Sequence, residues 1–309
     1  KKGFVARTLK PFVEARMYYK KNPTVINKKR SKGLKWVLVS SYGYLRFREF
    51  KLGLAAAHQA CCAYAREILI DSAHTCEELG AQVIHGIVDS LYVKTKDPEK
   101  VCKEIEYQSG IPLSYEGHFK WIVFLPSIND SARPLPHRYY GAYSTGGFKA
   151  RGIEVRQKGT PLLVRKFQQW MLEQMSECDD LEEIRALHPL FLKQISLLLK
   201  NPNPKDLIIR IKLSKSEYEK NIPQKQFAKL VKPGQTVKFI YTRKGPVLVS
   251  KYKADFDYQK YAGLLERAIR VLFQPLIREE LTLLSSQGSR QLSLNSKEFQ
   301  KQTQGTHTQ

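Results

Sequence analysis

Hydrophobic and polar residues alternate with a helical period over the first part of the chain. This spacing predicts a helix over residues 7–20, a break at Asn22-Pro23, and a second helix that leads into residues 35–38. Residues 50–79 are rich in Ala, Leu and Ile and contain no Pro, which predicts a long, largely buried helix. The N-terminal third is therefore expected to be a helical hairpin followed by one long helix.

The period changes from helical to alternating after Gly80. Residues 82–85 and 90–93 are expected to form two short strands around a turn, and residues 98–108 a helix. Further strands are expected at 113–118, 120–125, 138–144 and 149–154, with a loop at 126–136. This arrangement predicts the α+β class with a mostly antiparallel sheet.

Helical spacing returns from Pro161 onwards. The expected helices are 162–174, 181–199 and 258–273, and a basic segment of mixed pattern lies between the last two. Thr160 and Pro161 are expected to be the N-cap and the first residue of the first of these helices. The polar tail after Leu284 is expected to be disordered.

The composition gives the chain a strong positive charge. The chain has 309 residues, 52 Lys or Arg and 29 Asp or Glu, giving a net charge of +23. Fourteen of the basic residues but only Glu14 and Glu49 fall within residues 1–50, and residues 201–250 hold eleven basic and three acidic residues. Two basic blocks favour a polyanion as partner, either nucleic acid or an anionic membrane surface. A run of charge is also compatible with a solvated face.

The remaining composition excludes several classes. The five cysteines form no CxxC pair and are odd in number, so we expect reduced, mostly buried thiols and neither a zinc ribbon nor a disulfide framework. The chain has no GxSxG motif and no apolar run of about 18 residues. His58, on an Ala-rich helix, is expected to be a core histidine. We expect a soluble, intracellular protein.

The predicted hairpin carries the first candidate site. Arg16 and Lys20 are four residues apart and therefore share one helical face, and Lys35 follows on the second helix. Three converging cations suit a triphosphate. An ordinary solvent-facing stripe gives the same spacing.

The sequence from Lys35 to Tyr44 carries a more specific pattern. It resembles the motif of family B DNA polymerases in which a lysine of the fingers helix precedes an Asn-Ser-x-Tyr-Gly turn. Lys35, Ser40, Tyr42 and Gly43 match, and Val39 replaces the usual Asn. The resemblance implies that Arg16, Lys20 and Lys35 bind the phosphates of the incoming dNTP and that Tyr42 packs near the nascent base pair.

A second motif of that family is similar to the segment from His85 to Val93. Asp89 matches the second aspartate of the Tyr-Gly-Asp-Thr-Asp-Ser palm motif, and Ile87 replaces the first. The resemblance implies that Asp89 is catalytic and binds metal in a site for two Mg²⁺ ions. A single Asp in a β-turn also fits ordinary turn chemistry.

Two later segments are similar to the family's DNA contacts. The segment 136–141 resembles a Lys-x-Tyr element that touches the primer backbone, with His137 in place of Lys, and the segment 149–156 resembles the passage from palm to thumb. The residues implied as DNA contacts are Arg138, Tyr139, Lys149 and Arg151. Alternatively, Arg151 and Arg156 pair with Glu154 and neighbouring residues.

The resemblance extends over about residues 3–273 and implies a fold and a domain order. We expect helical-hairpin fingers (1–40), a palm with an antiparallel sheet (41–160), a mainly helical thumb (161–284) and a disordered tail (285–309). The expected partners are primer-template DNA, dNTP and an upstream polymerase segment or subunit with the exonuclease and the first metal-binding Asp. Gln291 to Leu294 faintly resembles a sliding-clamp-binding peptide.

The resulting hypothesis is the C-terminal polymerase portion of a family B DNA polymerase, an enzyme that is cytoplasmic and nucleoid-associated, has no membrane partner, and is inactive without the upstream Asp. The alternative is a polymerase homologue that has lost catalysis and acts as a DNA-binding or scaffold subunit. Val39, Ile87 and His137 favour this alternative, and the retained triphosphate residues oppose it. A general basic RNA-binding protein is not supported, because the chain has no aromatic RNA-recognition signature.

Overall fold

The computed structural model describes residues 3–127, 134–253 and 255–277. The chain forms two compact units, unit 1 (Lys1–Ser114) and unit 2 (Tyr115–Gln309), which are described separately below.

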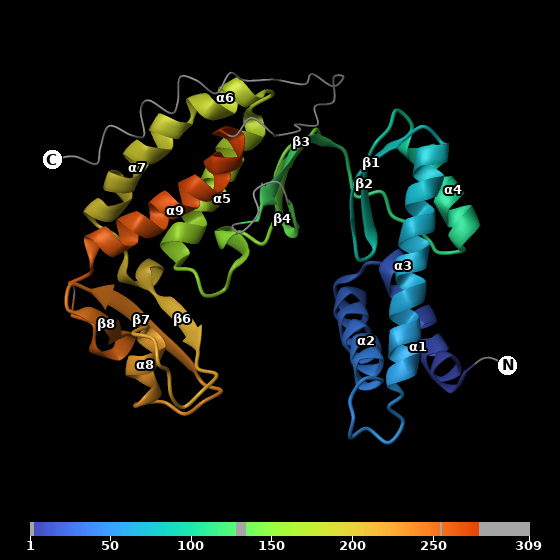
Figure 1. The fold of residues 1–309 in the computed structure, drawn as a ribbon, viewed down its shortest axis with the longest axis horizontal. Helices are drawn as coiled ribbons and strands as arrows, with labels where there is room; N and C mark the ends of the chain where they lie inside the picture. Colours follow the sequence, from blue (N-terminus) through green and yellow to red (C-terminus); the bar gives the residue numbers. More distant parts are fainter. Residues whose placement is uncertain (1–2, 128–133, 254, 278–309) are drawn as a thin grey trace. The chain divides into compact units, whose positions relative to one another are not determined.

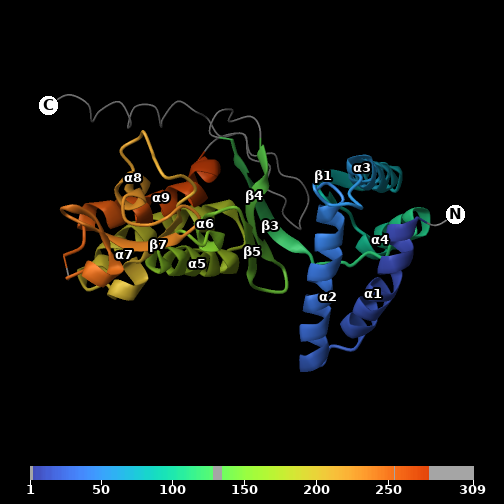
Figure 2. The ribbon, with the colours of Figure 1, turned by 90° about the horizontal axis from the view of Figure 1, so that it is seen from below.

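Unit 1 begins with two packed helices (Figure 1). They are α1 (Phe4–Lys21) and α2 (Val25–Tyr44). The predicted break at Asn22-Pro23 is confirmed, and Thr24 ends it because its side chain accepts a hydrogen bond from the Asn27 amide at 3.1 Å and so caps α2. The hairpin is seen from another side in Figure 2.

The rest of unit 1 is a long helix packed on a β-hairpin and a shorter helix. The elements are α3 (Ala55–Glu78), β1 (Gln82–Ile87), β2 (Ser90–Lys94) and α4 (Pro98–Ser109). The strands pair antiparallel and confirm the predicted strand-turn-strand. Residues 45–54 form turns rather than the start of the long helix. The prediction that this helix is largely buried was wrong, because only its C-terminal half packs on β1, β2 and α4 and its buried residues are Ser72, Thr75 and Cys76.

Unit 2 contains two antiparallel sheets of three strands. The first has the order β3-β4-β5, formed by β3 (Phe119–Pro126), β4 (Pro134–Tyr143) and β5 (Phe148–Arg151). The second has the order β6-β7-β8, formed by β6 (Ile209–Lys212), β7 (Thr236–Thr242) and β8 (Gly245–Leu248). The predicted strand at 113–118 is absent: Pro112 precedes this range, Gly117 has φ 148°, and these residues pair with no neighbouring strand.

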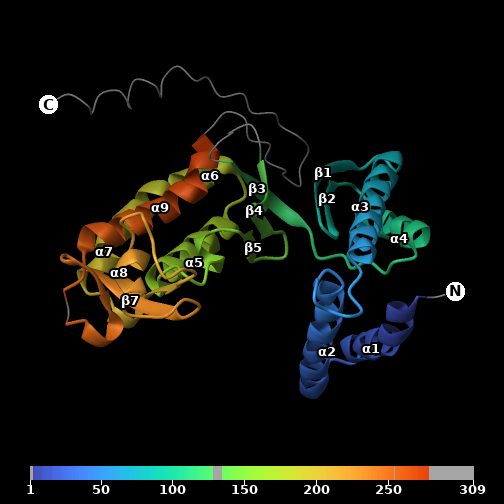
Figure 3. The same ribbon diagram turned by 60° about the horizontal axis from the view of Figure 1, so that its bottom comes forward.

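Helices fill the rest of unit 2 (Figure 3). The helices are α5 (Leu162–Glu177), α6 (Leu181–Ala186), α7 (His188–Lys200), α8 (Pro223–Ala228) and α9 (Tyr258–Ile277), with 3₁₀ turns η1 (Glu154–Arg156), η2 (Pro204–Leu207) and η3 (Val249–Lys251). The predicted single helix over 181–199 is two, α6 and α7. Leu187 lies between them, and Pro189 in the first turn of α7 has no N–H to continue the hydrogen bonds of α6. Thr160 is not the N-cap of α5: Pro161 holds that position with ψ 144°, and no side chain caps it.

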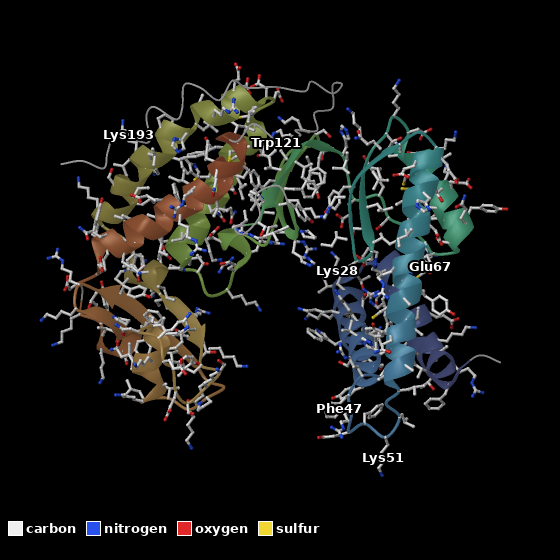
Figure 4. The ribbon with its side chains drawn as sticks, in the orientation of Figure 1. Lys28, Phe47, Lys51, Glu67, Trp121 and Lys193 are labelled. Atoms are coloured by element: carbon white, nitrogen blue, oxygen red, sulfur yellow. The ribbon has the colours of Figure 1, made fainter. Side chains whose placement is uncertain are left out.

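The core of unit 2 lies between the first sheet and helices α5, α7 and α9. Trp121, Val123 and Tyr140 extend from the sheet into it, where they meet Phe167 and Phe273 from the helices. The Trp121 side chain is labelled in Figure 4. The Tyr140 hydroxyl donates a hydrogen bond of 2.5 Å to the Leu272 carbonyl, so this core also joins β4 to α9.

Burial of Tyr140 predicts alkaline instability. Burial raises the pKa of its hydroxyl, so the folded protein keeps this proton above pH 10 while the unfolded chain releases it. The contribution of Tyr140 to the free energy of unfolding is therefore complete below pH 10. Above pH 10 this contribution falls by about 1.4 kcal/mol per pH unit. In denaturant titrations at pH 7 and between pH 10 and 11.5, Tyr140→Phe should be about 1 kcal/mol less stable at pH 7 but decline less steeply. The exposed Tyr107 gives the control, since Tyr107→Phe should keep the wild-type slope. Equal slopes for Tyr140→Phe and wild type would contradict this account.

Candidate functional site

The α1–α2 hairpin carries the predicted cations Arg16, Lys20 and Lys35. Arg16 and Lys20 lie on α1 and Lys35 lies on α2, so the packing of the two helices brings them into one hairpin. Lys20 and Lys35 are exposed, whereas Arg16 is partly buried. Its Nε is buried and has no hydrogen-bond partner among the described residues.

The face of α2 that packs in the hairpin shows where Lys35 lies. The residues of α2 and its C-cap that are half-buried or buried recur every three or four positions, as a packed helical face requires. They are Asn27, Ser31, Leu34, Leu38, Ser41 and Leu45. Lys35 lies next to this stripe, at its solvent edge. Arg30, which the sequence motifs did not single out, lies 5.6 Å from the centre of the Tyr19 ring and joins the two helices by a cation–π contact.

Tyr42 lies in the last turn of α2, not in a turn after it. The predicted Tyr-Gly turn does not form, because the helix continues through Gly43 to Tyr44. The Tyr42 side chain is 38% exposed, its ring stacks on His58 of α3 and its hydroxyl contacts Cys62. The hydrogen bond with Cys62 raises the pKa of the Tyr42 hydroxyl above its usual value. His58 is thus half-exposed and stacks on Tyr42. The prediction that it is a core histidine was therefore wrong.

All five cysteines are free thiols, as predicted. Only Cys76 and Cys178 are buried, so the expectation of mostly buried thiols was wrong. Cys62 and Cys102 are half-buried and Cys61 is exposed, because α3 and α4 pack on few neighbours in unit 1.

Asp89 lies at the tip of the β1–β2 hairpin. Ile87 and Ser90 form the closing pair, so Val88 and Asp89 make a two-residue turn. Val88 has φ 55°, a conformation that is costly for a β-branched residue and is usually taken by Gly. Asp89 is exposed, with Ser90 Oγ 3.5 Å from its Oδ1. The carboxylate is thus open to a ligand at the tip of the hairpin.

The described residues alone do not form a complete metal site. No group of three His, Cys, Asp or Glu side chains that could hold a metal ion occurs within the described parts of the chain. Asp89 fits one oxygen ligand of a magnesium ion, which prefers carboxylates and water. The other protein ligands would have to come from outside these residues.

The candidate DNA contacts lie on the first sheet of unit 2. Tyr139 is directly opposite Arg151 on the neighbouring strand, and Lys149 is two residues from Arg151, so these three share one face of the sheet. Arg151 is exposed, and Lys149 forms an ion pair with Glu116. Tyr139 is 3% exposed, so a DNA contact from its ring requires the ring to be uncovered.

Arg138 is held in place by the glycine that follows β5. Its Nε donates a hydrogen bond of 3.2 Å to the Gly152 carbonyl. Gly152 has φ +69°, and a Cβ there would lie 2.3 Å from the His137 carbonyl oxygen, so only glycine fits this close approach. The Lys-Ala-Arg-Gly sequence thus brings Arg138 and Arg151 to the same end of the β4–β5 pair.

Glu154 does not pair with Arg151 or Arg156, the alternative left open by the sequence. It is 5% exposed, accepts a hydrogen bond of 2.9 Å from Gln168 Nε2 and lies 3.5 Å from Arg267 Nε. This network ties η1 to α5 and α9. Among the described residues neither arginine forms an ion pair, which leaves both charges for a ligand.

No family model matches the chain. DNA polymerase 2 of Saccharolobus solfataricus is 32% identical over 214 residues, which are 68% of this chain and 32% of that protein. The solved structure of the family B DNA polymerase from the hyperthermophilic archaeon Pyrobaculum calidifontis aligns with a TM-score of 0.56 and 22% identity, over 94% of this chain and 39% of that one.

The chain belongs to the family B DNA polymerases.

A further member, DNA polymerase 1 of Sulfolobus acidocaldarius, is 25% identical over 269 residues, or 80% of this chain and 29% of that protein. The family B chain thus spans about a third of the length of the curated relatives it matches. The predicted α+β polymerase fold is confirmed. The tail 285–309, including the clamp-like segment at Gln291, lies outside the described residues. In the parts of the chain that are described, no helix has both the length and the hydropathy to cross a membrane.

Proposed function

We propose that this chain is the fingers, palm and thumb portion of a family B DNA polymerase and takes part in template-directed transfer of nucleotides from dNTP to a primer 3′-hydroxyl. The proposed boundaries are fingers at 1–40, palm at 41–160 and thumb at 161–284. The observation that carries the proposal is the order of features in unit 1: a hairpin with Arg16, Lys20 and Lys35, then Tyr42, then Asp89 on a β-turn. A protein that only grips DNA has no need of this set.

The hairpin cations are proposed to bind the triphosphate. Lys20 and Lys35 are exposed on the hairpin, and Arg16 lies one helical turn from Lys20 on α1, which supports a role in binding an anion. Cations beside a transferring phosphoryl group neutralise charge that builds up on the phosphates and on the pyrophosphate that leaves. Tyr42, with a ring partly open to solvent, is proposed to pack against the nascent base pair.

Asp89 is proposed to supply one carboxylate of a two-metal Mg²⁺ site. Bound there, the magnesium ions would stabilise the attacking and leaving oxygens. The role of this chain is to present the Asp89 carboxylate at a fixed position on the β1–β2 hairpin. The remaining carboxylate is proposed to come from a polymerase segment outside these 309 residues.

The surface of unit 1 supports a protein partner of this kind. Within its described residues, the buried hydrophobic side chains of unit 1 are Leu45, Cys76, Ala81, Val101 and Ile105. Its large exposed hydrophobic side chains are more numerous and include Phe4, Val25, Trp36, Leu52 and Tyr64. Exposed apolar surface of this extent is typical of an interface. The proposed occupant is the segment with the exonuclease and the first palm motif.

Unit 2 is proposed to bind the primer-template duplex through phosphate contacts. Lys149 and Arg151 share one face of two adjacent strands with Tyr139, and Arg138, the neighbour of Tyr139 on β4, lies at the same end of these strands as Arg151. Such contacts position a protein on DNA without reading sequence, as a polymerase requires. The proposed location is with the DNA, in the nucleoid. A sliding clamp is a further proposed partner.

The triphosphate proposal is tested by Lys35→Ala. In primer extension by this chain assembled with the upstream polymerase segment, we expect the KM for dNTP to rise about 10- to 100-fold, since a charge-assisted hydrogen bond to phosphate is lost. Lys29→Ala is the matched control: it removes the same charge from α2, but six residues away, on another face of the helix. An unchanged KM for Lys35→Ala would contradict the assigned role.

The alternative function is a non-catalytic DNA-binding subunit. It is favoured by the single carboxylate at the Asp89 turn, where Ile87 replaces an acid. The two functions differ in nucleotide binding. Mg²⁺-dependent dNTP binding that is lost in Lys35→Ala supports the enzyme, whereas duplex affinity that does not respond to dNTP or Mg²⁺ supports the scaffold.

A further inference from the structure

Three side chains join the last turn of α2 to the first turns of α3. The rings of Tyr42 and His58 stack with centroids 4.4 Å apart and an interplanar angle of 23°. The Tyr42 hydroxyl lies 2.7 Å from Cys62 Sγ, and this sulfur lies 3.9 Å from His58 Nδ1. His58 and Cys62 are four residues apart, so they lie on the same face of α3. The face of one helix thus holds both the ring and the hydroxyl of Tyr42.

The segment between the two helices sets this geometry. The Tyr44 ring packs against Phe50 at 5.4 Å and Phe47 at 6.0 Å, and Phe47 and Lys51 are seen in the loop that joins α2 to α3 (Figure 4). A Cβ on Gly53 would lie 2.7 Å from the Phe47 carbonyl oxygen. This turn is therefore packed against itself, and the first turns of α3 are held beside Tyr42 by the compact loop.

The contacts act on a side chain that stays accessible. Tyr42 is 38% exposed, and His58 covers one face of its ring. A stacked partner and a bonded hydroxyl fix both side-chain torsions of a tyrosine. A ring that is already ordered does not have to be immobilised when a base pair packs against it, so binding loses less entropy.

We propose that His58 and Cys62 are positioning residues that hold the Tyr42 ring in the orientation used to select the incoming nucleotide. The inference rests on the proposed function of Tyr42 at the nascent base pair. His58 supplies the stacking surface and Cys62 the partner of the hydroxyl. Loss of either contact frees the ring, so a mismatched pair is tolerated better while the chemical step is retained.

The contact itself is tested in this chain alone by ¹⁹F NMR of 3-fluorotyrosine at position 42. His58→Ala removes a stacked ring and Cys62→Ala removes a hydrogen-bond partner, so each should shift the resonance. Cys61→Ala, at the exposed neighbouring thiol, should leave it unchanged. A resonance that moves in neither His58→Ala nor Cys62→Ala would overturn the proposal, whatever the activity of the protein.

The effect on selection is tested in the assembled polymerase. For His58→Ala and Cys62→Ala we expect the ratio of kcat/KM for the correct and the mismatched dNTP to fall about tenfold, with kcat for the correct dNTP nearly unchanged. His58→Phe retains a stacked ring and Cys62→Ser retains a hydrogen-bonding atom, so both should restore the ratio. An unchanged ratio, or a fall that neither conservative variant restores, would overturn the positioning role.

The two experiments separate this inference from the proposed function. If the assembled wild-type protein extends no primer, the function of the chain as a polymerase fails, and the positioning inference fails with it even where the ¹⁹F shifts confirm the contact. If wild type is active and Lys35→Ala raises the KM, but the His58 and Cys62 variants select nucleotides normally, only the positioning inference fails.

Discussion

Asp89→Asn is expected to lower primer extension by about 10³-fold or more in an assembly of this chain with the upstream polymerase segment. The substitution keeps the size of the side chain and its place in the β-turn but removes the charge that would bind magnesium. A metal ion contributes several kcal/mol to stabilising charge in a transition state, and each 1.36 kcal/mol is a factor of ten in rate. Single-turnover extension of a primed template with Mg²⁺ and dNTP measures the loss.

Asp71→Asn is the matched control for this experiment. Asp71 is an exposed carboxylate on α3 of the same unit, so the variant changes the net charge equally. It should keep the wild-type rate within about twofold, as is usual for surface substitutions. Circular dichroism of both variants tests folding. An Asp89→Asn assembly that binds DNA and extends it at the wild-type rate would refute a metal-binding role for Asp89 and favour a catalytic centre elsewhere.

The affinity of the chain for primer-template duplex is expected to fall by about 10³-fold or more between 50 and 200 mM salt. The net charge of +23 includes a basic block in each unit, and six or more phosphate contacts would release enough counterions for this dependence. Fluorescence anisotropy of a labelled duplex across the salt range gives the slope of log affinity against log salt. A flat response would exclude binding driven by phosphate contacts.

Single substitutions show which residues contribute to this salt dependence of DNA affinity. Arg151→Gln removes an exposed charge at the end of β5 and should weaken DNA binding and reduce the slope by about 1, whatever the DNA sequence. Lys103→Gln removes the same charge from an exposed position on α4, outside the proposed contacts, and should leave the slope unchanged. Equal effects of the two variants would indicate that net charge alone, without a defined contact, determines the affinity.

The local features of the site could be predicted from sequence because each depends on neighbours in the chain. The hairpin of α1 and α2 follows from helical spacing and the break at Asn22-Pro23, and the Asp89 turn from two short alternating runs. The strands β6, β7 and β8 were missed although residues Thr236–Phe239 alternate in burial, because strands of four to seven residues give only short runs of alternation.

Contacts between distant residues could not be predicted from spacing. The stacking of Tyr42 on His58 depends on how the loop after α2 folds, and the burial of Glu154 depends on Gln168 and Arg267 from two other helices. The sequence alone offered Arg151 and Arg156 as partners of Glu154, since they are near in the chain. Packing placed a different arginine beside it.

By itself, then, the sequence determined the class of fold, the order of the motifs and the residues that carry charge, since these depend on composition and on short-range periodicity. Tertiary structure alone decided which side chains are available. It left the Asp89 carboxylate and Arg151 open, covered Tyr139, and fixed Tyr42 against α3. The reason is physical: burial and hydrogen bonding depend on which atoms meet in space, and residues far apart in the chain meet only when the helices and sheets pack.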